Sequence, residues 1–170
     1  MSNYTSVTLK GNPVTLVGKP LTTGEPAPPF KAVAQDLSTV EYRTFRDRVY
    51  ILSAVPSLDT PVCDKETRTF NQEATRLSSD IEVITISMDL PFAQKRWCGA
   101  AGIDKVTVIS DHRDAEFGQR YGVLIQELRL LARAVFVVDK LGVVRYIEVV
   151  PEIAQEPDYS SILEAAQSLL

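Results

Sequence analysis

The sequence is short of the residues on which much polar chemistry depends: its 170 residues include only two cysteines, Cys63 and Cys98, and one histidine, His112. A structural zinc site usually takes four cysteine or histidine ligands, so no metal site is expected. A Ser-His-Asp or Cys-His mechanism would have to use His112 as its sole base. Because cysteine pairs in a reducing cytosol are usually transient, catalytic or metal-bound, the cysteines indicate thiol chemistry or two inert buried thiols.

Long apolar runs and basic tracts are also missing. The longest uninterrupted apolar run, Ala134–Val138, is far short of the roughly 18 residues that span a bilayer, so no membrane partner is expected. Met1–Lys10 has neither a basic start nor a continuous hydrophobic region, which argues against a secretory signal and favours a cytoplasmic location. The net charge is −4, and an acidic chain without a basic tract is not expected to bind nucleic acid.

The composition that remains is typical of a globular protein. Apolar residues make up 45% of the chain and charged residues 24%, close to the average for soluble domains. No internal repeat, low-complexity segment or linker divides the sequence. We therefore expect a single domain over residues 1–170.

The hydrophobic pattern alternates between strands and helices. An N-terminal β-hairpin is expected from Val7–Leu9 and Val14–Val17, which flank the turn formers Gly11-Asn12-Pro13. The pattern further predicts strands at Val49–Val55, Ile81–Met88, Val106–Ile109, Ala132–Val138 and Val143–Val150, and helices at Thr60–Leu77, Pro91–Ala101, Ala115–Tyr121 and Tyr159–Leu169. The last two strands read as a hairpin. Together these elements indicate an α/β fold in which helices flank a central mixed β-sheet.

Cys63 lies in the first turn of a predicted helix, with Thr60 as N-cap and Pro61 at the first helical position. The unpaired N–H groups of a helix start stabilise a thiolate and can also hold a bound oxygen atom, which suits a nucleophile that attacks an O–O or S–S bond. Three nearby carboxylates oppose the thiolate: Asp59, Asp64 and Glu66. In the alternative interpretation, Thr60 only caps the helix and Cys63 is a small buried hydrophobic residue.

The residues around Cys63 resemble the active-site motif of peroxiredoxins, Pro-x-x-x-Thr-x-x-Cys, which Pro56, Thr60 and Cys63 match. The string Asp59–Cys63 is similar to the thiol peroxidase class, a branch of the atypical two-cysteine peroxiredoxins. Further stretches that agree with this class follow in order: Asp89–Gln94, Arg96–Gly99, Glu116-Phe117, Ala132–Val135 and Glu156–Tyr159. One departure is Trp97, where Phe is expected.

This resemblance implies a thioredoxin-like fold and a thioredoxin-dependent peroxidase that serves in antioxidant defence. Its substrates would be hydrogen peroxide and small alkyl hydroperoxides, and it would need no cofactor. Cys63 would be the peroxidatic cysteine and pass through a sulfenic acid. Cys98 would be the resolving cysteine and form an intramolecular disulfide with Cys63. The resemblance also implies a homodimer.

Thr60 and Arg133 would complete the active site, and Pro56 and Val62 would line the substrate site. The candidate donors to the departing oxygen are the backbone N–H groups of Val62 and Cys63 and the guanidinium of Arg133. All close neighbours of Arg133 are apolar, so in an alternating strand it would face solvent. If both faces of that strand are covered, its buried charge needs a negative partner, which a Cys63 thiolate would supply.

Cys98 lies near the end of a predicted helix that Gly99 and Gly102 weaken. A disulfide needs Cα atoms within about 7 Å, and two cysteines in different helices can lie farther apart than that. We therefore expect the segment around Cys98 to unwind locally before it reaches Cys63. The alternative is a packed core thiol beside Trp97. His112 has no assigned role and is expected at the surface.

Two other functions compete with a peroxidase. A thiol–disulfide oxidoreductase normally uses Cys-x-x-Cys, whereas Glu66 stands three residues after Cys63. In a redox sensor or binding module, oxidation of Cys63 would change a partner surface, and the protein would oxidise once instead of turning over.

Overall fold

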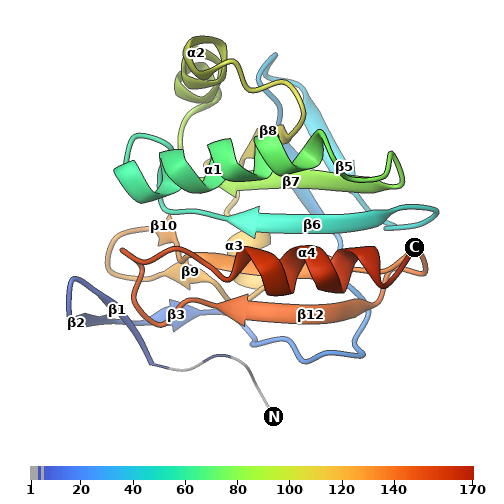
Figure 1. The fold of residues 1–170 in the computed structure, drawn as a ribbon. Helices are drawn as coiled ribbons and strands as arrows, with labels where there is room; N and C mark the ends of the chain where they lie inside the picture. The colour runs from blue at the N-terminus through green and yellow to red at the C-terminus, as the bar shows by residue number, and fades with distance from the viewer. Residues whose placement is uncertain (1–3, 5) are drawn as a thin grey trace.

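A seven-stranded mixed β-sheet forms the centre of the computed structural model, which describes residues 4 and 6–170 (Figure 1). The strands of this sheet are β4 (Phe30–Val33), β5 (Thr39–Tyr42), β6 (Val49–Ala54), β7 (Ile81–Ser87), β8 (Thr107–Ser110), β11 (Ala134–Val138) and β12 (Val144–Val149). Their order across the sheet is β12-β11-β6-β7-β8-β4-β5. Neighbours β6, β7 and β8 run parallel, and all other neighbouring pairs are antiparallel. The predicted α/β class and mixed sheet are confirmed.

Helices cover both faces of this sheet. The helices are α1 (Pro61–Ala74), α2 (Pro91–Ala101), α3 (Glu116–Arg120) and α4 (Tyr159–Gln167). Figure 1 shows α1 and α4 on the same face of the sheet, with α3 behind it and α2 beyond the β8 side. Among the described residues, no helix is long and apolar enough to cross a membrane.

The core strands alternate between two hydrophobic clusters because successive strand residues point to opposite faces. In β6, Ile51 packs in the cluster that includes Phe70 of α1 and Ile162 of α4. The next residue, Leu52, packs in the cluster that includes Phe117 of α3. Both faces of β6 are therefore buried, which explains why its sequence reads as a nearly continuous apolar run.

The N-terminal hairpin is present, but its second strand differs from the prediction. β1 (Val7–Leu9) pairs antiparallel with β2 (Asn12–Val14) through a turn at Lys10 and Gly11. Both turn residues have positive φ, 50° and 81°, as a two-residue hairpin turn of the right-handed twist requires. The turn therefore closes before Pro13, which lies in the strand where the sequence predicted a turn.

The rest of the predicted second strand belongs to a different sheet. Residues Leu16–Val17 form β3, which pairs with β9 (Leu124–Ile125), and β9 pairs in turn with β10 (Leu130–Leu131). Thr15 separates β2 from β3, so the prediction of one strand over Val14–Val17 was wrong. Such a pairing over more than a hundred residues leaves no local signal in the sequence.

Other boundaries moved by a few residues. α2 has the predicted bounds, and Gly102 ends it in the left-handed conformation, whereas α1 ends at Ala74 instead of Leu77. The strands β4 and β5 at one end of the sheet were not predicted, because each has only four residues and β4 follows a proline-rich segment.

Candidate active site

Cys63 is held at the start of α1, and none of its surface is exposed to solvent. The chain leaves β6 at Ala54 and enters α1 at Pro61, where a missing backbone N–H carries no cost. The N–H of Asp64 donates to the carbonyl of Thr60 at 2.9 Å and closes the first turn. The sulfur therefore lies at the positive end of the helix dipole, as predicted from the sequence.

Thr60 precedes the helix, but its hydroxyl does not cap it. The Thr60 side chain accepts no hydrogen bond from the first turn of α1, and Oγ1 instead donates to the carbonyl of Ser57 at 2.8 Å. The reason is the tight turn before the helix, in which the Thr60 N–H also donates to Ser57 at 3.1 Å. The prediction of a side-chain cap was wrong, and the Thr60 hydroxyl therefore does not compete with a bound oxygen atom for the first N–H groups of α1.

Arg133 is buried and its guanidinium contacts three groups. Nη2 lies 3.2 Å from Sγ of Cys63, Nε donates to the carbonyl of Ile153 at 2.8 Å, and Nη1 donates to Oε2 of Glu66. The residue precedes β11, which begins at Ala134 instead of the predicted Ala132. The solvent-facing interpretation of Arg133 is excluded, and the predicted contact with Cys63 is present.

Glu66 is the site residue that the sequence analysis did not find, because there it counted only as a nearby negative charge. It lies one turn after Cys63 on the buried face of α1, where Oε1 accepts a hydrogen bond from Ser53 of β6 at 3.0 Å. Burial raises the pKa of Glu66 to about 7, although the adjacent Arg133 lowers it. The signal was its spacing with Cys63 and Phe70, which places Glu66 on the apolar helix face.

The three groups share a single positive charge. Burial by itself lowers the pKa of Arg133, but Glu66 and Cys63 outweigh that effect and the pKa is raised, so the guanidinium stays charged. Two neighbours, the carboxyl of Glu66 and the thiol of Cys63, can each supply the opposing negative charge. The guanidinium thus contacts both acidic groups at once, Glu66 through Nη1 and Cys63 through Nη2.

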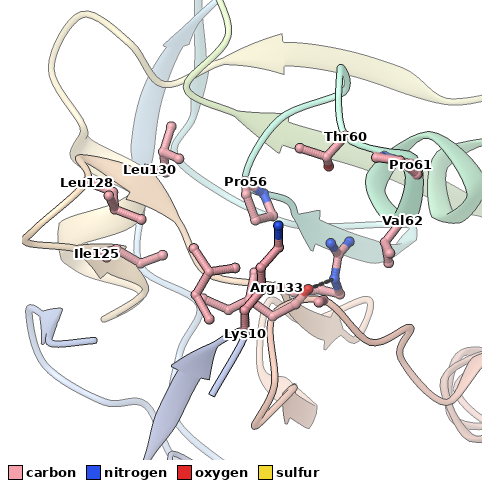
Figure 2. Close-up of a pocket in the computed structure, with 12 residues that line it drawn as sticks. Lys10, Pro56, Thr60, Pro61, Val62, Ile125, Leu128, Leu130 and Arg133 are labelled. Atoms are coloured by element: carbon pink, nitrogen blue, oxygen red, sulfur yellow. Dashed lines mark hydrogen bonds between the residues drawn. The ribbon is translucent and has the colours of Figure 1, made fainter. Parts of the chain in front are cut away.

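A pocket of about 380 Å³ opens beside this network, which is enough room for a small organic ligand. Pro56, Thr60, Val62 and Arg133 line it, so the structure brings together all four residues predicted around the sulfur. The other lining residues are Leu9, Lys10, Pro61, Ile125, Leu128, Leu130, Ile153 and Ala154. Figure 2 shows the α1 residues facing Ile125, Leu128 and Leu130 across the pocket, whose walls are mainly apolar.

Cys98 lies in α2 and belongs to the same hydrophobic cluster as Cys63. Both are free thiols, and both are buried. Burial raises the pKa of the Cys98 thiol, and Nε2 of Gln35 donates to its sulfur at 3.5 Å. The two cysteines thus lie in different helices on one side of the sheet, without a bond between them.

Trp97 links the two helices that carry the cysteines. Its indole Nε1 donates to Oδ1 of Asp64 in α1 at 2.9 Å, and Asp64 also pairs with Arg68 at 2.9 Å. The Arg68 guanidinium lies over the indole ring, 5.7 Å from its centroid. This contact fastens α2 to α1 next to Cys63.

The histidine lies away from this site. His112 follows β8, is half-buried rather than fully at the surface, and does not line the pocket. Over residues 4 and 6–170, no group of three or more histidine, cysteine or acidic side chains is arranged to hold a metal ion.

Comparison with known proteins adds a family to this geometry. The redoxin family model matches residues 22–163. The chain is 53% identical to a thiol peroxidase of Oceanobacillus iheyensis, over 96% of this chain and 97% of that protein, and 52% identical to a thiol peroxidase of Bacillus subtilis, over 96% and 98%. A crystal structure of a peroxiredoxin-like protein from Aquifex aeolicus matches with a TM-score of 0.92 and 45% identity, over 97% of each chain. The chain therefore belongs to the redoxin family and, within it, to the thiol peroxidases, as the motif around Cys63 indicated.

Proposed function

We propose that this thiol peroxidase reduces hydrogen peroxide and small alkyl hydroperoxides at Cys63, with Cys98 as the resolving cysteine. The observation that carries the proposal is the Cys63 sulfur at the start of α1, 3.2 Å from the Arg133 guanidinium and next to the pocket. A helix N-terminus and a fixed cation are the surroundings that favour a reactive thiolate. The pocket brings a peroxide to Val62 and Arg133, the two lining residues that adjoin the buried sulfur.

In the first step the Cys63 thiolate attacks the terminal oxygen of the hydroperoxide. The S–O bond forms as the O–O bond breaks, Cys63 becomes a sulfenic acid, and the departing oxygen takes a proton to leave as water or an alcohol. Negative charge builds on that departing oxygen. The Arg133 guanidinium and the first N–H groups of α1 are the donors placed to stabilise it.

In the second step the Cys98 sulfur attacks the sulfenic sulfur of Cys63, and an S–S bond forms as water leaves. Cys98 is buried in α2, so we propose that the end of this helix unwinds to bring the sulfurs together. Gly99 and the left-handed Gly102 weaken that end, because glycine restrains the backbone least. Two electrons from a thioredoxin then reduce the disulfide and return both thiols.

The wider setting follows from the same family. The fold is the thioredoxin-like fold of this family. We propose that residues 1–170 form a single domain, that two copies form a homodimer, and that the protein works in the cytoplasm as part of antioxidant defence. Soluble thioredoxin and its reductase, which regenerate such a peroxidase, would be the partners there.

Peroxide consumption coupled to NADPH, with thioredoxin and thioredoxin reductase, tests this function. The parent chain should turn over many times, Cys63→Ser should not react, and Cys98→Ser should consume one equivalent of peroxide and stop. Mass spectrometry of the peroxide-treated parent should find Cys63 and Cys98 bridged within one chain. A parent that oxidises once and is not recycled would support the redox sensor instead, and activity in Cys63→Ser would refute the peroxidatic role.

A further inference from the structure

Lys10 is a charged residue of the pocket that the proposed reaction does not use. It occupies the turn between β1 and β2 and lines the pocket together with its neighbour Leu9. In Figure 2 the Lys10 side chain extends from the hairpin into the pocket, on the side of Pro56 and Arg133. Lys10 is itself exposed to solvent, and its ammonium group lies beside mainly apolar walls, close to the residues that surround Cys63.

The hairpin that carries Lys10 is fixed to the body of the protein. The N–H of Thr8 donates to the carbonyl of Pro151 at 2.8 Å, and the N–H of Ile153 donates to the carbonyl of Thr8 at 2.9 Å. The N–H of Gly11, directly after Lys10, donates to Oε1 of Glu152 at 2.8 Å. Hydrogen bonds on both sides of Lys10 therefore fix its backbone, so only its side chain can adjust to a ligand.

The charge of Lys10 has no counterpart in the part of the chain that the structure describes. No carboxylate there lies within ion-pair distance of its Nζ. Glu152 is engaged by backbone N–H groups of the hairpin and of Ala154, the latter at 2.8 Å. The other cation of the pocket, Arg133, is committed to Glu66, Cys63 and Ile153. A ligand anion would meet the Lys10 ammonium first.

We propose that Lys10 is a specificity-determining residue that favours organic hydroperoxides bearing a carboxylate, an inference that rests on the proposed function. The apolar walls take the hydrocarbon part of such a substrate, and the ammonium pairs with its carboxylate while the peroxide end reaches Cys63. The chemistry is unchanged: the S–O bond forms, the O–O bond breaks, and a hydroxy acid leaves. Because Lys10 is exposed, the pair has the modest strength of a surface ion pair, which sets the size of the effect expected below.

The test compares 6-hydroperoxyhexanoic acid with its methyl ester, which keeps the flexible chain and the peroxide but removes the charge. The rate constant for oxidation of reduced Cys63 is measured by rapid quenching with an alkylating agent and mass analysis. The ratio of the acid rate to the ester rate should fall by about threefold or more in Lys10→Met, and further in Lys10→Glu. Lys10→Arg should retain most of the ratio. Salt should lower the ratio in the parent chain and in Lys10→Arg, but not in Lys10→Met.

Lys105→Met is the matched control, because it removes the same charge from an exposed lysine outside the pocket. This variant should keep the parent ratio. If Lys10→Met keeps it as well, or if Lys105→Met lowers it equally, Lys10 does not select the carboxylate. If the parent chain reacts with neither hydroperoxide, the proposed peroxidase function fails, and that result is distinct from a ratio that ignores Lys10.

Discussion

The buried carboxyl of Glu66 makes the stability of this protein depend on pH in a way that one substitution should remove. Glu66 has an ordinary pKa of 4.5, and burial raises it to about 7 in the folded chain. The folded state therefore binds this proton more tightly than the unfolded state does. The resulting stability is complete below pH 4.5 and is lost as the pH rises through 7, a total of about 3 kcal/mol.

Glu66→Gln keeps the shape and one acceptor oxygen for Arg133 but cannot titrate. Urea unfolding of the reduced parent and of Glu66→Gln at pH 5, 6, 7 and 8 gives the free energy of unfolding of each. Between pH 5 and 8 the variant should gain about 2.5 kcal/mol relative to the parent, whatever the offset between them at one pH. The comparison isolates Glu66, since both proteins keep Asp111, whose pKa burial raises to about 6.

Parallel pH curves for the two proteins would refute this reasoning. They would mean that Glu66 stays ionised from pH 5 upward, with Arg133 compensating its burial in full. A variant that loses stability relative to the parent as the pH rises would give the opposite sign. That result would show that the ion pair, not the protonated acid, is the stabilising form.

Three further predictions follow from the two cysteine helices and from one close backbone contact. A disulfide between Cys63 and Cys98 closes a loop of about 36 residues, which would stabilise a static fold by about 4 kcal/mol. Because α2 must deform to form this bond, the melting temperature of the oxidised form should be no higher than that of the reduced form. A large rise of the melting temperature in calorimetry would contradict a catalytic bridge. Trp97→Phe removes the hydrogen bond to Asp64, so it should lower the free energy of unfolding by about 1 kcal/mol and speed disulfide formation after peroxide is added. An unchanged rate of disulfide formation in rapid-quench mass analysis would show that this contact does not hold α2 in place. Gly18 has a φ of +103°, and a Cβ added to it would lie 2.0 Å from a backbone oxygen. Gly18→Ala should therefore lower the free energy of unfolding, measured in urea, by more than about 1 kcal/mol. A stability equal to that of the parent would contradict this close contact.

Much of the fold could be predicted because local patterns in the sequence specify its helices and central strands. The bounds of α2 follow from Pro91 at its start and the glycine at its end, and the apolar run of β6 predicts a strand covered on both faces. The short strands β4 and β5 could not be found this way. Each has four residues that include a charged one, Lys31 in β4 and Glu41 in β5, so neither shows the apolar run that marked the equally short β8.

The same distinction applies to the active site, where features set by neighbouring residues could be predicted and features set by the exact path of the chain could not. The motif placed Cys63 at a helix start and grouped it with Pro56 and Thr60, since all three lie within a single loop and turn. It did not reveal that the Thr60 hydroxyl donates backwards to Ser57, because that depends on the exact path of the turn.

The sequence by itself determined where the reactive sulfur lies along the chain and which kind of chemistry it can perform, because helix starts, strand periods and cysteine number are properties of near neighbours. Only the tertiary structure decided which charges join Arg133 around that sulfur. Glu66 and Arg133 meet across 67 positions of sequence, and Lys10 reaches the pocket from the other end of the chain. Contacts of this kind arise when distant segments pack into one core, so nothing in the local order of residues specifies them.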